Sequence, residues 1–326
     1  MKKVLALVLI TALFFTIVGC QKSAINGSMI STKVILDYLP NTNHTGLYVA
    51  LEKGYYKDVG LDVEIIEQTE GATATLIATG KGDFGISYQE DVTNALSSEE
   101  PLPIKTIATI IQHNTSGFAS YKGKNIKTVQ DFAGKIYAGW GSPAEEAVLN
   151  AVMTKFGVSP ASIKIITSDD SGMATLIDKV DLKWIFWAWD GIGAKLQGIE
   201  LNYIELRDLD SRLDYYTPVL ITNKKLIEEN PEKISKFMKA TKKGYEFAIA
   251  NPLAAAEILH KYAPDYDLEF LKESQEYLSQ KYSEDSEKWG IMQSSVWNNY
   301  TEFMLEQGLI SHSIVAEDCY TNEFIQ

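Results

Sequence analysis

Residues 34–66 constrain the fold of this chain most, because their pattern predicts a strand, a polar break, a helix and a second strand in that order. A short apolar run at residues 34–36 stops before Pro40, which has no N–H to donate to a sheet. Asn41 carries a side-chain oxygen suited to capping a helix, and apolar residues follow it at helical spacing. The β-branched run at residues 61–66 then completes a strand–helix–strand unit.

The rest of the chain repeats this alternation and then becomes helical. Further strands are expected at residues 84–87, 104–111, 136–138, 163–166, 184–188 and 202–206. Because the sheet restarts midway, the pattern predicts an α/β fold with two parallel-sheet lobes and a two-segment hinge, with crossovers at residues 114–123 and 217–222. The predicted lobes are residues 33–117 plus 218–326, with the C-terminal helices, and residues 118–217. We expect those helices to pack on the first lobe and the hinge.

Residues 37–65, DYLPNTNHTGLYVALEKGYYKDVGLDVEI, resemble the opening of a family of periplasmic binding proteins. This family includes the formylaminopyrimidine-binding proteins of ABC importers and the thiamine-pyrimidine synthases of fungi. The resemblance continues through GDFGISYQED, GWGSPAEEA, FWAWDG and YYTPVLITN, and covers nearly all of the chain after the N-terminal segment. It implies the type II periplasmic-binding-protein fold and a solute-binding protein that serves an ABC permease and its ATPase.

Residues 1–19 indicate a lipoprotein signal peptide. Lys2 and Lys3 precede an apolar run, and Gly19 stands before Cys20, as in a bacterial lipobox. Cys20 is therefore the predicted lipidation site, and the polar residues 20–32 suit a tether. We expect a monomer held by its lipid on the extracytoplasmic face of the cell membrane.

Charge and cysteine content narrow the choice of partners. The formal net charge of −13 makes nucleic acid an improbable direct partner. The chain has two cysteines, so if Cys20 carries a lipid, Cys319 has no partner for a disulfide within the chain. The role of Cys319 stays open, and stability must come from the hydrophobic core.

Asp37, Tyr38 and Asn41 follow the first strand and are candidate ligand-binding residues, because ligands of open parallel sheets bind at the carboxyl ends of the strands. The resemblance implies that Tyr38 stacks on a pyrimidine ring and that Asp37 lies beside it, although fungal relatives carry Trp and Asn there. The alternative is that Tyr38 is a core aromatic and Asp37 a helix cap. His44, also a candidate, is expected first as a helix-start residue, then as a ligand contact, and last as a metal ligand.

Tyr88 follows the strand at residues 84–87 and is a candidate for a second aromatic wall of the site. The acids after it, Glu90 and Asp91, are more typical of a helix start. Which of Glu90, Glu145 and Glu146 faces the cleft stays open at this stage.

The motif WGSPAEE, which starts at Trp140, marks a second candidate site. Ser142 as N-cap and Glu145 three residues later predict a capping box, which explains both without a ligand. Gly139 and Gly141 flank Trp140 and allow close approach of the backbone to a ligand. Trp140, Gly141, Ser142 and Glu145 are therefore predicted site residues.

Trp184, Trp187 and Trp189 crowd into one short stretch that ends in Asp190. If the stretch is an extended strand, Trp187 and Trp189 point to one face and Asp190 to the other. Core packing is the default for each tryptophan, and Trp189 and Asp190, at the end of the strand, are the predicted ligand contacts.

The predicted site contains no cation. The two arginines, Arg207 and Arg212, lie outside the candidate motifs, which also lack lysine. Sites for sulfonate, nitrate or phosphate usually supply guanidinium or ammonium groups. An aromatic and acidic cleft instead suits a neutral or weakly basic heterocycle.

The leading hypothesis is capture of a thiamine-precursor pyrimidine, of the hydroxymethylpyrimidine or formylaminopyrimidine type. The alternatives are another flat ring such as riboflavin, or a sulfonate or nitrate. A pyrimidine synthase is less favoured, because the resemblance implies an enzyme with a cysteine-rich cluster that this chain lacks. We therefore expect no enzymatic activity, no metal and no cofactor.

Overall fold

The computed structural model describes residues 29–67, 72–168 and 172–325. The predicted signal peptide, Cys20 and the tether up to residue 28 lie outside the described residues. Residues 30–32, which we expected in the tether, are instead the start of the first strand, because Ile30 and its neighbours pair with the strand that begins at Leu61. Within the described residues, no helix is both long enough and apolar enough to cross a membrane.

The first sheet has the strand order β2-β1-β3-β10-β4. Its strands are β1 (Ile30–Ile35), β2 (Leu61–Ile66), β3 (Phe84–Ser87), β4 (Ile104–Thr109) and β10 (Val219–Asn223). The predicted parallel pairs β1–β2 and β1–β3 are confirmed, but β10 runs antiparallel to β3 and β4. The sheet is therefore mixed, because β10 enters it as the chain returns from the second lobe.

The second sheet has the order β7-β6-β8-β5-β9. Its strands are β5 (Ser116–Tyr121), β6 (Ile136–Gly139), β7 (Lys164–Thr167), β8 (Leu182–Phe186) and β9 (Leu201–Glu205). The expectation that residues 114–123 are only a crossover is wrong for most of this segment, since β5 lies inside the sheet. Phe118 and Ala119 explain why, because they are buried in hydrophobic clusters on opposite faces.

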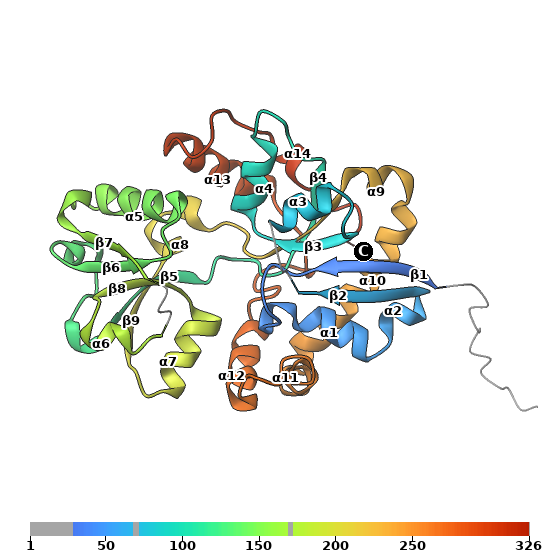
Figure 1. Cartoon of the computed structure of the whole chain (residues 1–326), viewed down its shortest axis with the longest axis horizontal. Helices are drawn as coiled ribbons and strands as arrows, with labels where there is room; N and C mark the ends of the chain where they lie inside the picture. The colour runs from blue at the N-terminus through green and yellow to red at the C-terminus, as the bar shows by residue number, and fades with distance from the viewer. Residues whose placement is uncertain (1–28, 68–71, 169–171, 326) are drawn as a thin grey trace, which may run out of the picture.

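Helices cover both sheets, as Figure 1 shows, with the second sheet and its helices on the left. Those of the first lobe before β4 are α1 (Thr45–Glu52), α2 (Tyr55–Asp58), α3 (Thr73–Ala78) and α4 (Gln89–Leu96). Those of the second lobe are α5 (Pro143–Lys155), α6 (Thr175–Asp178), α7 (Ile192–Leu196) and α8 (Leu206–Leu209). Val34 and Ile35 face opposite sides of the first sheet and join different hydrophobic clusters.

The helical C-terminal part of the chain packs on both lobes. It contains α9 (Lys224–Glu229), α10 (Pro231–Ala250), α11 (Pro252–His260), α12 (Leu268–Ser279), α13 (Ser294–Glu306) and α14 (Ala316–Cys319). Trp297 of α13 is buried in the first lobe, as expected. Tyr300 and Phe303 of the same helix are buried in the core of the second lobe, which we did not expect. The helix joins both cores because its first turns pack in the first lobe and its later turns pack in the second.

Two crossovers connect the lobes, one between β4 and β5 and one before β10 (Figure 1). The second was expected at residues 217–222, which is wrong for residues 219–222, because they pair with β3 and β4 as part of β10. Nδ1 of His113 lies 2.6 Å from Oδ2 of Asp214, and the N–H of Asn114 donates to Oδ1 of the same aspartate at 2.9 Å. The hydrogen bond that His113 donates to the carboxylate of Asp214 raises the pKa of His113 to about 9. The two crossovers are therefore tied to each other. The lobe boundaries at residues 117–118 and 217–218 stay predictions, and the first falls inside β5.

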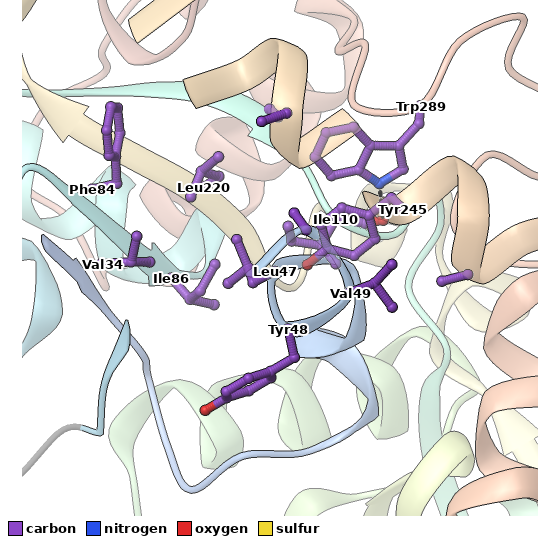
Figure 2. Close-up of a cluster of buried hydrophobic side chains, with 14 of the residues drawn as sticks. Val34, Leu47, Tyr48, Val49, Phe84, Ile86, Ile110, Leu220, Tyr245 and Trp289 are labelled. Carbon is purple, nitrogen blue, oxygen red and sulfur yellow. Dashed lines mark hydrogen bonds between the residues drawn. The ribbon is translucent and has the colours of Figure 1, made fainter. Parts of the chain in front are cut away.

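The core beneath α1 holds the site's first loop in place. Tyr245 of α10 stacks on Trp289, with ring centroids 4.2 Å apart, and Trp289 donates its indole N–H to the carbonyl of Ile110 (Figure 2). The hydroxyl of Tyr245 donates to the carbonyl of Asn43 at 2.8 Å. A buried aromatic pair thus anchors the turn that leads from β1 into α1.

Candidate functional site

A cavity of about 530 Å³ lies between the lobes, at the carboxyl ends of β1, β3, β6 and β8 and over the two crossovers. This volume is in the range of small-molecule sites. Nine of the predicted site residues line it: Asp37, Tyr38, Asn41, Tyr88, Trp140, Ser142, Glu145, Trp189 and Asp190. The other two, the buried His44 and the exposed Gly141, do not line the cavity but hydrogen-bond to lining residues. Ligand binding by these residues stays a prediction.

His44 holds the carboxylate of Asp37 at the edge of the cavity. The N–H of Asn41 donates to Nδ1 of His44 at 3.2 Å, so a neutral His44 carries its proton on Nε2. Nε2 lies 2.8 Å from Oδ1 of Asp37 and donates to it. The His44 side chain is fully buried, whereas that of Asp37 is partly exposed. One carboxylate oxygen of Asp37 is therefore fixed by the protein. Among the described residues, the other has no protein hydrogen bond and is available to a ligand.

Asn41 starts the helix as predicted. Its side-chain oxygen accepts from the N–H of Asn43 at 2.9 Å, and together with His44 it forms a capping box. The predicted helix-start role of His44 is confirmed in this form, with the ring as the acceptor. These caps explain why the loop that carries Asp37 and Tyr38 has a defined shape.

Four aromatic side chains around the cavity are exposed to a degree unusual for their size. Tyr38 is 65% exposed, Trp140 51%, Tyr88 42% and Phe186 41%. The alternative that Tyr38 is a core aromatic is therefore wrong. Rings left open around one cavity offer stacking faces to a flat ligand.

Trp187 and Trp189 do not share one face of a strand, so that prediction is wrong. The strand β8 ends at Phe186, and residues Trp187–Gly191 form a π-helical turn. Trp187 packs against Tyr203 in the second lobe, with ring centroids 4.7 Å apart. Trp189 instead lines the cavity and lies edge-on to Phe270, with ring centroids 4.6 Å apart. The wider turn sends the two indoles in different directions.

Glu145 braces the loop before α5 instead of completing a capping box. Ser142 accepts from the N–H of Glu145 at 3.1 Å, as predicted. The carboxylate of Glu145, however, accepts from the hydroxyl of Tyr137 at 2.5 Å and from the N–H of Gly141 at 2.9 Å. A Cβ at Gly139 would lie 2.0 Å from this carboxylate. The glycine therefore makes room for the buried acid, which fixes the position of the WGSP loop.

Glu90 is the acid in the cavity whose protonation is most strongly perturbed. Burial raises its pKa to about 7, the negative charge of Asp91 adds to the rise, and a hydrogen bond from Tyr300 opposes it. The hydroxyl of Tyr300 lies 3.5 Å from Oε2 of Glu90, and its ring stacks on that of Tyr215 with centroids 4.1 Å apart. Among the described residues, Tyr300 of helix α13 is thus the only one whose hydroxyl donates a hydrogen bond to Glu90. Of the three acids left open by the sequence, Glu90 and Glu145 line the cavity and the exposed Glu146 does not.

Replacing Glu90 with glutamine is expected to remove a pH-dependent loss of stability. The unfolded carboxyl ionises near pH 4.5 and the folded one near pH 7, so the folded state binds more protons between these values. The contribution of Glu90 to stability must therefore fall as pH rises from 4.5 to 7. At pH 7.5, E90Q should exceed the wild type by about 2 kcal/mol in free energy of unfolding. At pH 4.5 the two should be equal. Urea unfolding at both pH values measures this.

Glu146→Gln is the matched control, since Glu146 is exposed on the same chain and lies outside the cavity. It should leave the difference between the two pH values as it is in the wild type. If E90Q lost as much stability between pH 4.5 and pH 7.5 as the wild type does, Glu90 would not be the group with the raised pKa.

Asp190 also has a raised pKa, because it is desolvated by burial. The N–H of Phe186 donates to its Oδ2 at 2.9 Å, and Lys183 also opposes the rise. The π-helical turn brings this carboxylate back over the end of β8 and into the cavity wall.

No lysine or arginine lines this cavity in the described part of the chain. Arg207 pairs with Glu205 and Glu284, and Arg212 pairs with Asp210 and Glu306. The expectation that both arginines lie outside the site is confirmed. Four acidic side chains and no cation therefore surround the cavity.

Sequence reasoning missed or set aside several lining residues. They are Thr42, Asn43, Ile111, Thr115, Trp184, Phe186, Ala188, Tyr215, Thr217 and Pro218. Most come from the two crossovers and from β8. The crossovers were predicted as hinges, and since a hinge lies at the bottom of a cleft between lobes, that position was a usable signal.

The structure also shows the surroundings of Cys319 and the arrangement of the His, Cys, Asp and Glu side chains. Cys319 is buried in the core of the first lobe, and burial raises the pKa of its thiol to about 12. It is thus a packing residue with an inert thiol. Across the described ranges, no group of three or more His, Cys, Asp or Glu side chains is arranged to hold a metal ion.

Comparison with known sequences finds relatives that are named as binding proteins and as synthases. The family described as NMT1/THI5 like matches residues 41–255. The formylaminopyrimidine-binding protein of Halalkalibacterium halodurans is 25% identical over 99% of this chain and 99% of its own. The riboflavin-binding protein RibY of Chloroflexus aurantiacus is 24% identical, over 89% of this chain and 84% of RibY. A 4-amino-5-hydroxymethyl-2-methylpyrimidine phosphate synthase of Saccharomyces cerevisiae is 26% identical over 68% of each chain.

Solved structures share the fold. The ligand-binding component of an ABC-type import system from Staphylococcus aureus, with zinc bound, has a TM-score of 0.67 and 14% identity, covering 91% of this chain and 98% of its own. The alkanesulfonate-binding protein SsuA from Xanthomonas axonopodis pv. citri, bound to MOPS, has a TM-score of 0.65 and 12% identity, covering 90% and 100%. The predicted two-lobed periplasmic-binding-protein fold is confirmed.

Proposed function

The chain belongs to the NMT1/THI5-like family, and from this premise we propose that it is an extracytoplasmic solute-binding protein of an ABC importer. Its ligand is a flat, uncharged or weakly basic heterocycle, and the best-supported one is a thiamine-precursor pyrimidine of the hydroxymethylpyrimidine or formylaminopyrimidine type. The observation that carries the proposal is a cavity between two lobes whose lining, in the described ranges, contains aromatic rings and carboxylates and includes no lysine or arginine.

The chemistry of an aminopyrimidine matches these groups. Its ring can stack on the open faces of Tyr38, Tyr88 and Trp140. Its exocyclic amine and a protonated ring nitrogen are donors, and the free oxygen of Asp37 can accept from them. A carboxyl such as Glu90, with its raised pKa, can bind a neutral ring when protonated and a protonated ring when ionised.

The named relatives support the pyrimidine and one close alternative. The relative named for binding formylaminopyrimidine matches over nearly the full length of both chains, and the relative named for binding riboflavin matches over most of both. Riboflavin is therefore the second candidate. A sulfonate or nitrate has less support, because the aromatic cavity has no cation in its lining.

A role in binding is favoured over catalysis. The relatives named as binding proteins cover 99% and 89% of this chain, whereas the yeast synthase covers 68%. In the cell, the protein would pass its solute to a permease driven by an ATPase. It would be held at the membrane by a lipid on Cys20, as the N-terminal sequence predicts.

Isothermal titration of the purified protein with four solutes tests the proposal. The solutes are hydroxymethylpyrimidine, formylaminopyrimidine, riboflavin and taurine. At least one of the two pyrimidines should bind with a Kd in the micromolar range or below, as in other preorganised cavities, and taurine should not bind. Binding of riboflavin alone would select the second candidate. Binding of taurine alone would contradict both.

A further inference from the structure

A second, smaller cavity of about 200 Å³ adjoins the first inside the second lobe. The two share four lining residues: Trp140, Trp184, Phe186 and Asp190. The remaining residues of the smaller cavity, called the annex below, are Ala138, Gly139, Ser168, Met173, Lys183 and Ile185. Its volume equals that of roughly six water molecules, which suits a short chain of atoms attached to a ring.

Lys183 gives the annex a chemical character that the main cavity lacks. Its side chain is only 5% exposed, and its Nζ donates to the carbonyl of Gly172 at 3.2 Å. It lies on β8 between Leu182 and Trp184, whose side chains pack in one core of the lobe, so strand alternation directs Lys183 to the other face with Ile185. A buried ammonium group thus lies next to an aromatic cavity that has no cation of its own.

Asp190 limits what the ammonium group can bind. It lines both cavities, and the positive charge of Lys183 opposes the rise in its pKa that burial causes. Among the described residues that line the annex, Lys183 and Asp190 carry the ionisable groups, so the carboxylate would repel an anionic group that approaches the ammonium group. Met173 and Ile185 add apolar surface. An uncharged chain with an acceptor oxygen fits this combination best.

We propose that the annex binds an uncharged, oxygen-bearing substituent of the ring, and that Lys183 donates a hydrogen bond to a hydroxyl or carbonyl oxygen of that substituent. This inference rests on the proposed function, because the ring itself occupies the main cavity. It makes the annex the part of the site that distinguishes ligands with the same ring. A ring without such a substituent occupies the main cavity alone, and water fills the annex. A ring with a hydroxyl- or carbonyl-bearing chain occupies both cavities.

Matched ligand pairs and one substitution test this assignment. The first pair is formylaminopyrimidine and 4-amino-2,5-dimethylpyrimidine, and the second is riboflavin and lumiflavin; within each pair only the first member carries an oxygen-bearing chain. The wild type should bind that member at least about tenfold more tightly, in line with a hydrogen bond from a charged donor. Lys183→Met should weaken binding of the member with the oxygen-bearing chain by about tenfold. It should change the affinity for the shorter member, which lacks that chain, by less than about twofold.

Lys164→Met is the control, since Lys164 is exposed at the start of β7 and lines neither cavity. It should leave all affinities unchanged. If the wild type binds neither these pairs nor hydroxymethylpyrimidine, the proposed function fails and the inference fails with it. If it binds hydroxymethylpyrimidine but neither pair, the proposed function stands and the annex assignment is wrong. If the wild type binds the shorter member of the bound pair equally well, or if K183M weakens both members equally, only the annex assignment is wrong. The comparison within the wild type decides the matter even if K183M does not fold.

Discussion

Replacing Gly244 with alanine is expected to destabilise the protein by about 3 kcal/mol in free energy of unfolding. Helices α1 and α10 cross at this glycine, and a Cβ added there would lie 2.0 Å from the carbonyl oxygen of Gly46 and 3.0 Å from the Cβ of Ala50. The oxygen belongs to the backbone, so α1 itself would have to move. Helix propensity alone would predict the opposite sign, since alanine is the better helix former. Here the steric clash outweighs propensity.

Urea unfolding measures the effect of G244A, and Gly193→Ala is the matched control. Gly193 also lies in a helix, but a Cβ there would meet only a ring carbon of Phe270 at 3.8 Å, an ordinary contact. The control should therefore leave the protein equally stable or raise its stability by up to about 1 kcal/mol. If G244A were as stable as the Gly193→Ala control, helices α1 and α10 would not pack as closely at Gly244 as the structure shows. Because α1 follows the loop that carries Asp37, G244A should also weaken ligand binding.

Replacing Tyr38 with alanine is expected to lower the affinity for the correct heterocycle by about tenfold or more, while stability changes by less than about 0.5 kcal/mol. Tyr38 is 65% exposed, and its ring lines the cavity. A side chain that is largely exposed contributes little to folding, but it can become buried against a bound ring. Titration of the variant with the ligand that the wild type binds, beside urea unfolding, separates the two effects.

Leu39→Ala is the control for this experiment. Leu39 is the next residue in the same loop and is 45% exposed, but it does not line the cavity. Its truncation should leave both affinity and stability close to those of the wild type. Tyr38→Phe should keep most of the affinity, because the stacking face remains. If Y38A binds the ligand as tightly as L39A, the stacking role of Tyr38 is wrong.

Much of the candidate site could be predicted from local sequence. Asp37, Tyr88 and Trp140 each come just after a short apolar strand, and ligands of parallel sheets bind at such strand ends. Asp37 and Tyr88 follow strands of the first sheet, and Trp140 follows a strand of the second. The structure brings all three to one cavity. That they share a cavity is what the strand ends suggested, while ligand binding by these residues stays a prediction.

Other features could not be predicted, because they depend on contacts between distant segments. The antiparallel entry of β10 follows from the return of the chain from the second lobe. The partners of the Glu145 carboxylate depend on the space left by Gly139. Lys183 appears in the sequence as an ordinary strand residue, and only the arrangement of β8 against the rest of its sheet buries it beside Asp190.

By itself, the sequence determined most of the strands and helices, the two-lobed fold and the absence of arginine from the candidate motifs, because periodicity, caps and composition are local properties of the chain. It missed β5 and β10, which were expected as crossovers. Only the tertiary structure decided which side chains share a cavity, which of the acids are buried and which helix joins the two cores. Those properties depend on distances between residues far apart in sequence, as when Tyr300 meets Glu90 across 210 positions.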